Sequence, residues 1–194
     1  MHYLYRMKRI ILVTGGERSG KSSYAEQRAL ATNERPVYMA TARIWDEEFR
    51  QRVAVHRERR GERWDCIEEE KYLSRHDLTG RTVVVDCVTL WCTNFFFDRR
   101  AKEDAESTEE ETAEQARLRL DATLEEMKEE IARFTAHEAT YIFVTNEIGM
   151  GGVPAHPVQR QFTDLLGWLN QHLAALADEV VLMVSGIPVI IKKS

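Results

Sequence analysis

The sequence has few cysteines and no long apolar run. Its three cysteines, Cys66, Cys87 and Cys92, form no Cys-x-x-Cys pair and have no histidine nearby at the spacing of a zinc site. We therefore expect free thiols, as is usual in a reducing compartment, and a cytoplasmic protein. No segment approaches the roughly 20 apolar residues of a membrane helix. The apolar run at residues 10–13 is also too short for the core of a signal peptide.

An excess of positive charge is missing as well. Lysine and arginine together number 27 against 32 aspartates and glutamates, which gives a net charge of −5. An acidic chain gains little from a phosphate backbone, so nucleic acid is not expected as a main partner. The 43% hydrophobic and 30% charged residues are typical of a globular protein. With no repeat and no linker, residues 1–194 are expected to form a single domain.

Short apolar runs alternate with helical patterns along the chain, which predicts an α/β fold. We expect a mostly parallel sheet with helices on both faces, and residues 189–191 returning as an antiparallel edge strand. The polar, acidic segment 98–116 is interpreted as a solvated connection and the start of the next helix. The expected strands are 10–13, 37–41, 82–86, 141–145 and 180–184. The expected helices are 22–33, 46–60, one with an apolar face from Leu120 to Phe134, and one from Pro157 whose buried stripe comprises Val158, Phe162, Leu165, Leu169, Leu173 and Leu176.

A phosphate-binding motif follows the first strand. Residues 15–22 read Gly-Gly-Glu-Arg-Ser-Gly-Lys-Ser and fit G-x-x-x-x-G-K-[ST], between a strand and a helix. Glycines let backbone N–H groups approach phosphates, and the helix N-terminus favours negative charge. We expect Lys21 to reach the β- and γ-phosphates and Ser22 to ligate Mg²⁺. The motif predicts a P-loop NTPase fold of the RecA-like type, with nucleotide bound by Gly15, Gly16, Glu17, Arg18, Ser19, Gly20, Lys21 and Ser22.

Two further residues are candidates, each with a structural alternative. Asp86 ends an apolar strand, where a carboxylate could ligate Mg²⁺ or simply cap the strand. His56 lies in the expected helix 46–60 among arginines, and a neutral imidazole there could attack a nucleotide phosphorus. An ordinary surface histidine on a charged helix is the alternative.

Several motifs resemble the bifunctional adenosylcobinamide kinase / adenosylcobinamide-phosphate guanylyltransferase family. The P-loop followed by Ala25 and Glu26 is one of them. The likeness extends from residue 10 to residue 192 and departs from the family only in the N-terminal residues, at Cys92 and in the acidic segment before residue 117. The other motifs are 38–42 (Tyr-Met-Ala-Thr-Ala), Arg52-Val53 with His56, Arg60, Trp64 and Glu68, 86–94 (Asp-Cys-Val-Thr-Leu-Trp-Cys-Thr-Asn), 146–154 from Asn146 to Pro154, and the tail 177–188.

The resemblance implies two reactions. The first phosphorylates the aminopropanol hydroxyl of adenosylcobinamide with ATP or GTP, with Lys21 as a catalytic residue. The second transfers GMP from GTP to that phosphate through a GMP–histidine at His56 and releases pyrophosphate. It further implies Mg²⁺ at Ser22 and Asp86 and a homo-oligomer, with a trimer expected. The nucleotide-binding residues it adds to the P-loop are Thr41, Arg57, Arg60, Glu68 and Asp86. Asn146 and Glu147 could hold the corrinoid or a neighbouring subunit.

Two other functions fit parts of the pattern. A RecA-like ATPase module would share the strand pattern, although a basic nucleic-acid surface would be expected with it. A small-molecule kinase with another acceptor would share the P-loop, but it would not need a histidine among arginines.

Overall fold

A seven-stranded sheet is the centre of the molecule. The computed structural model describes residues 8–44, 47, 50–51, 58, 61–106 and 111–194. The strands lie in the order β3-β2-β4-β5-β1-β6-β7. Five neighbouring pairs are parallel, and β7 runs antiparallel to β6. Their bounds are β1 Arg9–Gly15, β2 Val37–Ala40, β3 Asp65–Glu68, β4 Thr82–Asp86, β5 Thr140–Val144, β6 Glu179–Val184 and β7 Ile187–Lys193.

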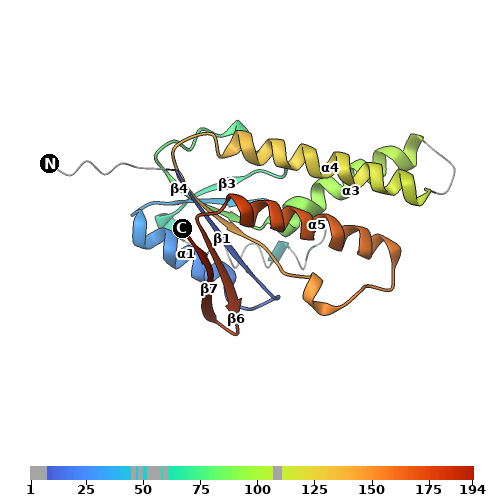
Figure 1. Cartoon of the computed structure of the whole chain (residues 1–194). Coiled ribbons are helices and arrows are strands. Elements are labelled where there is room, and N and C mark those ends of the chain that lie inside the picture. Colours follow the sequence, from blue (N-terminus) through green and yellow to red (C-terminus); the bar gives the residue numbers. More distant parts are fainter. Residues whose placement is uncertain (1–7, 45–46, 48–49, 52–57, 59–60, 107–110) are drawn as a thin grey trace.

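Helices cover both faces of this sheet (Figure 1). On one face lies α1 (Lys21–Thr32), whose Ala25 and Ala29 pack on the strands. On the other face lie α3 (Val88–Glu106), α4 (Ala113–Phe134) and α5 (Pro157–Leu176). Short 3-10 turns are η1 (Gly61–Arg63), η2 (Leu73–Arg75) and η3 (Gly149–Gly151). Within the described ranges, no helix is long and apolar enough to cross a bilayer.

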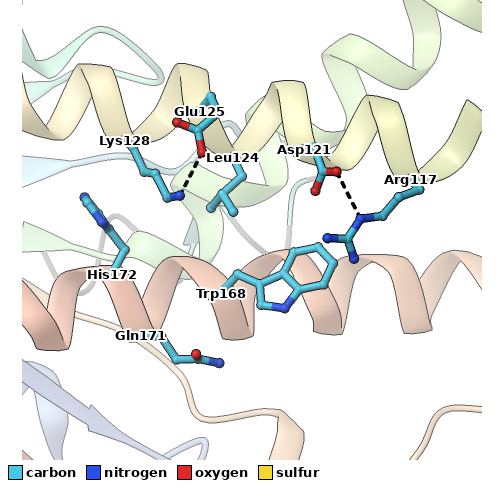
Figure 2. Close-up of a pocket in the computed structure, with 8 residues that line it drawn as sticks. All are labelled: Arg117, Asp121, Leu124, Glu125, Lys128, Trp168, Gln171 and His172. Carbon is cyan, nitrogen blue, oxygen red and sulfur yellow. Dashed lines mark hydrogen bonds and ion pairs between the residues drawn. The ribbon is translucent and has the colours of Figure 1, made fainter.

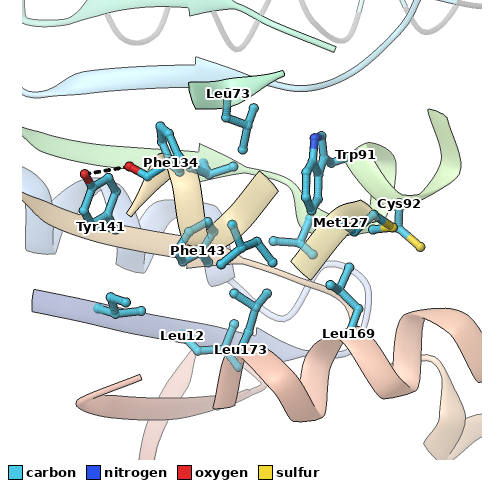
Figure 3. Close-up of a cluster of buried hydrophobic side chains, with 14 of the residues drawn as sticks. Leu12, Leu73, Trp91, Cys92, Met127, Phe134, Tyr141, Phe143, Leu169 and Leu173 are labelled. Atoms are coloured by element: carbon cyan, nitrogen blue, oxygen red, sulfur yellow. Dashed lines mark hydrogen bonds between the residues drawn. The ribbon is translucent and has the colours of Figure 1, made fainter. Parts of the chain in front are cut away.

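The larger core lies between the sheet and the three helices. Strand β1 shows why both faces are filled, since Ile10 and Leu12 point to this core while Ile11 and Val13 point to α1. Such a strand is buried on both sides and therefore carries a continuous apolar run. Aromatic side chains occupy the centre of the larger core (Figure 3), where Phe134 meets Tyr141 edge-on with 5.0 Å between ring centroids.

The predicted fold class is confirmed, and so are the expected parallel strands and the antiparallel edge strand. Pro157 begins α5 as expected. Leu176 was wrongly assigned to the buried stripe of that helix, because it lies at the last turn and is 44% exposed. The expected helix 46–60 lies largely outside the described residues.

Two other parts of the expected layout are wrong. Strand β3 was not predicted, because it is a four-residue edge strand with no apolar run. Residues 98–106, assigned to a solvated connection, are the second half of α3. Ion pairs stabilise this charged part of the helix: Asp98 contacts Arg43 at 2.7 Å, and Arg99 contacts Glu126 on α4 at 2.6 Å. A polar composition therefore did not indicate a loop.

Candidate active site

The phosphate-binding loop leaves β1 at a glycine that no other residue can replace without a clash. Gly15 has φ 148°, and a Cβ built on it would lie 2.5 Å from the carbonyl oxygen of Met183 and 2.9 Å from Ser19 Oγ. Gly20, at the N-cap of α1, has a left-handed φ of 96°. Arg18 has φ 56°, a conformation that costs a non-glycine residue about 1 kcal/mol. The loop therefore has positive φ angles at three positions, and at Arg18 this conformation is unfavourable for the residue present.

A turn from the other end of the chain supports this shape. The turn between β6 and β7 consists of Ser185 and Gly186, with φ values of 50° and 84°. Its Gly186 N–H donates to the carbonyl of Ser19 at 3.0 Å. A Cβ on Gly20 would lie 3.4 Å from Gly186 Cα, so the two backbones are in close contact. The β6–β7 turn thus forms one wall of the P-loop, a contact that no local sequence signal predicted.

Two hydroxyls at the loop are buried without a partner. Those of Thr14 and Ser19 are shielded from solvent and make no hydrogen bond with any residue that the structure describes. Lys21 is 7% exposed, and its Nζ donates to the carbonyl of Gly16 at 2.6 Å. Burial lowers the pKa of Lys21, and the nearby Cys87, Asp86 and Glu17 oppose that effect. A buried ammonium beside unpaired hydroxyls is suited to bind an anionic ligand such as a triphosphate.

Asp86 lies at the carboxyl end of β4, two strands from the P-loop strand in the sheet. The hydroxyl of Tyr38 donates to Asp86 Oδ2 at 2.8 Å, and Tyr38 itself packs edge-on against Trp64. Tyr38 therefore positions the carboxylate, a role that the sequence analysis missed because an aromatic residue in a buried strand usually indicates core packing. The peptide bond after Asp86 is cis.

Magnesium fits this donor set. The described residues include no cluster of three or more His, Cys, Asp or Glu side chains that could hold a metal alone. Mg²⁺, however, is usually bound by one or two protein oxygens together with substrate phosphates and water. The Ser22 hydroxyl, in the first turn of α1, and the Asp86 carboxylate would supply those protein oxygens, and the bound ion would neutralise phosphate charge.

The other predicted site residues lie at different distances from the loop. Thr41 follows β2, is fully buried and donates its hydroxyl to the carbonyl of Cys87 at 2.8 Å. Glu68 ends β3, which is four strands from β1, or about 19 Å at the usual strand spacing. The structure therefore brings Thr41 beside Asp86 but leaves Glu68 at the far edge of the sheet. His56, Arg57 and Arg60 lie outside the described residues.

Apart from the P-loop, the structure has a hollow of about 500 Å³ between α4 and α5 (Figure 2). Its charges pair with each other along α4, Arg117 with Asp121 at 3.0 Å and Lys128 with Glu125 at 2.8 Å. Arg117 also covers the ring of Trp168. Because α4 and α5 cover the face of the sheet opposite α1, this hollow is separate from the P-loop.

The fold and the loop together define the class of protein. A mostly parallel sheet in which an inner strand, β1, leads through residues 15–22 into a helix is that of a P-loop NTPase. The family model for cobinamide kinase / cobinamide phosphate guanyltransferase matches residues 11–191. The chain belongs to this family of enzymes.

Known proteins of similar sequence agree with this assignment. The bifunctional adenosylcobalamin biosynthesis protein CobU of Escherichia coli strain K12 is 40% identical over 94% of this chain and 99% of its own length. The protein of the same name from Salmonella typhimurium is 38% identical over 94% of this chain and 99% of its own length. The bifunctional adenosylcobalamin biosynthesis protein CobP of Pseudomonas aeruginosa is 35% identical over 93% and 96%.

Solved structures are similar at a lower level. The flagellar accessory protein FlaH of Methanocaldococcus jannaschii aligns over 97% of this chain and 80% of that chain, with 13% identity and a TM-score of 0.45. An ATPase from the type III secretion system of pathogenic bacteria covers 91% of this chain and 51% of its own, with 9% identity and a TM-score of 0.48.

Proposed function

We propose that this protein phosphorylates adenosylcobinamide with ATP or GTP and then transfers GMP from GTP to the product, giving adenosylcobinamide-GDP and pyrophosphate. The observation that carries the proposal is the P-loop, in which Lys21 is buried and the buried hydroxyl of Ser19 has no partner among the described residues. The chain also belongs to the kinase/guanyltransferase family. Both reactions use a nucleoside triphosphate, and one such loop can hold it for each of them.

The described residues would act on the nucleotide as follows. The N–H groups at the start of α1 would hold the β-phosphate, and Lys21 would exchange its bond with the Gly16 carbonyl for bonds to phosphate oxygens. Asp86, fixed by Tyr38, and Ser22 would hold Mg²⁺, which would neutralise phosphate charge. Charge that develops on the transferred group would then be balanced by groups already in place.

The second reaction is proposed to pass through a covalent GMP–histidine at His56. The imidazole nitrogen would form a bond to the α-phosphorus while the bond to pyrophosphate breaks, and the corrinoid phosphate would then displace the histidine. Arg57 and Arg60 are proposed to neutralise the nucleotide phosphate during this step. Thr41 and Glu68 are proposed to contact the nucleotide on the β2–β3 side of the sheet.

Labelling with GTP that carries ³²P at the α-phosphate tests this proposal. The wild-type protein should acquire a covalent label that resists base and is lost in acid, as expected of a phosphoramidate. The His56→Ala variant should acquire none while keeping its kinase activity, because direct phosphorylation needs no protein nucleophile. His137→Ala, which changes an exposed histidine in the turn between α4 and β5, is the control.

The same experiment distinguishes the alternatives. A small-molecule kinase would transfer γ-phosphate to an acceptor without any α-label on the protein. A RecA-like ATPase would hydrolyse nucleotide whether or not adenosylcobinamide is present. Full labelling of His56→Ala would place the nucleophile elsewhere.

We also propose that the protein is a cytoplasmic homo-oligomer, with a trimer suggested by the resemblance. Strand β7 supports this proposal, because it is an edge strand with apolar residues that are exposed: Ile187 is 65%, Ile190 51% and Ile191 60% exposed. A second copy of the chain would cover them. Sedimentation equilibrium should give about three times the chain mass of 22.5 kDa, and Ile191→Lys should lower it; a wild-type monomer would refute the proposal.

A further inference from the structure

The turn after β5 lies between the two halves of the nucleotide site. In the sheet, Val144 of β5 pairs with Val13 of β1 on one side and with Asp86 of β4 on the other. The residues that follow Val144 therefore emerge between the P-loop and the proposed Mg²⁺ ligand. The Glu147 N–H donates to the carbonyl of Gly15 at 3.0 Å, which fixes its backbone beside the first glycine of the loop.

Two helices, α3 and α5, form hydrogen bonds with this turn. Both cover the face of the sheet opposite α1. Thr89 of α3 accepts a hydrogen bond from the N–H of Asn146 at 2.9 Å. Asn170 of α5 is 8% exposed, accepts from the Thr145 hydroxyl at 2.8 Å and donates to the carbonyl of Asn146 at 3.2 Å. These bonds are made by the backbone of the turn and by neighbouring side chains, so none of them depends on the side chain of Glu147.

The carboxylate of Glu147 has no hydrogen bond or ion pair with any other part of the chain that the structure describes. Two other carboxylates of this edge differ in that respect: Asp86 accepts from Tyr38, and Glu69 accepts from the N–H groups of Lys71 and Tyr72. Glu147 is partly buried, and its Oε1 lies 3.4 Å from the position that a Cβ on Gly149 would take. An immobilised backbone with an unpaired carboxylate is an arrangement that suits a proton acceptor.

We propose that Glu147 is the catalytic base of the kinase step. Its carboxylate takes the proton of the acceptor hydroxyl as that oxygen forms a bond to the γ-phosphorus. The bond from the γ-phosphorus to the bridging oxygen breaks, and its electron pair stays on the β-phosphate of the departing nucleoside diphosphate. Glu147 then releases the proton to water. This inference rests on the proposed function, because it requires an alcohol as the acceptor.

The test compares two isosteric substitutions at opposite ends of one strand. Glu147→Gln removes the base and keeps the shape, while Glu138→Gln changes an exposed carboxylate just before β5. The assay follows transfer of ³²P from γ-labelled GTP to adenosylcobinamide, and fluorescence titration with a labelled GTP analogue measures nucleotide binding. We expect kcat of Glu147→Gln to fall by about 100-fold or more, with nucleotide affinity unchanged. Glu147→Asp should recover part of the rate, and Glu138→Gln should match the wild type.

Each unfavourable result has its own meaning. If the wild type phosphorylates adenosylcobinamide and Glu147→Gln does so at a normal rate, the base is another group and the inference is wrong. If Glu147→Gln loses affinity for nucleotide, or regains its full rate at high Mg²⁺, Glu147 holds the loop or the metal, which also overturns it. If the wild type transfers no phosphate to adenosylcobinamide, the proposed function fails first.

Discussion

The two ends of the sheet differ in whether their polar and charged groups have partners. At the amino end, charges are paired: Glu179, which begins β6, contacts Arg9 at 2.8 Å and Arg28 at 2.7 Å. Asp65, which begins β3, contacts Arg35 and Arg81 in the same way. At the carboxyl end, the hydroxyls of Thr14 and Ser19 are buried without a partner among the described residues, and the carboxylate of Glu147 is unpaired there as well.

The amino end of the sheet is therefore expected to contribute mainly to the stability of the fold, and the carboxyl end mainly to activity. At the amino end, removal of one partner would leave the other charge partly buried and unpaired, which would destabilise the folded chain even without a ligand. Unpaired groups at the carboxyl end cost stability until a ligand arrives, because a buried polar group without a partner has lost its hydration. Substitutions at the carboxyl end should therefore lower activity without lowering stability, and substitutions at the amino end should lower stability without lowering activity.

The largest effect is expected at the carboxyl end, from Lys21→Ala. Both activities should fall by about 100-fold to 1,000-fold, because a charged contact to the transferring phosphate is lost. Thermal stability without nucleotide should not fall, since burial lowers the pKa of Lys21 and so disfavours its charged form in the folded chain. Calorimetry and both transfer assays measure this pair of results. Near-normal guanylyl transfer by the folded variant would require a second nucleotide site.

The reverse pattern is expected at the amino end, from Glu179→Gln. The hydrogen bond from Arg28 holds the pKa of Glu179 below its usual range, so the pair stabilises the fold above the unfolded pKa near 4.5 and loses that effect as the pH falls through the lower folded value. The variant should lose about 2–3 kcal/mol of unfolding free energy at pH 7. This loss should shrink as the pH falls below about 4.5 and disappear below the folded pKa of Glu179, and kcat should not change. Urea titrations at several pH values measure the difference, and an equal loss at all pH values would contradict this account.

The smallest effect concerns thiol reactivity. Cys87 follows Asp86 at the carboxyl end, yet burial and the Asp86 charge raise its pKa to about 12. Burial raises the pKa of Cys92 as well, whereas Cys66 on β3 is exposed. A thiol reagent should label Cys66 quickly in the native protein and all three cysteines only in denaturant. Native labelling of Cys87 at the rate of Cys66 would contradict this account.

Much of the fold followed from sequence patterns, and the failures have physical causes. The buried parallel strands were predictable because each is an apolar run beside a helical pattern, and residues 15–22 have a local signature. Strand β3 was not predicted because an edge strand needs no apolar run. The charged half of α3 was not predicted because its ion pairs, such as Arg99 with Glu126, join residues distant in sequence.

The site was less predictable than the fold for the same reason. The pattern made Lys21 and Asp86 candidates. It did not indicate that the hydroxyl of Tyr38 reaches Asp86 across 48 positions of sequence, or that the turn at Gly186 contacts Ser19 from near the other end of the chain. Local spacing carries no information about such contacts, which depend on the order of strands in the sheet.

The β6–β7 turn has a consequence for the order in which the site is built during synthesis. Residues 15–22 leave the ribosome early, but the neighbours of β1, which are β5 and β6, emerge more than a hundred residues later. The wall formed by Met183 and Gly186 comes later still. A nascent chain released before residue 186 should therefore contain the whole phosphate-binding motif and bind nucleotide poorly. Tight nucleotide binding is therefore expected only after the β6–β7 hairpin has been synthesised.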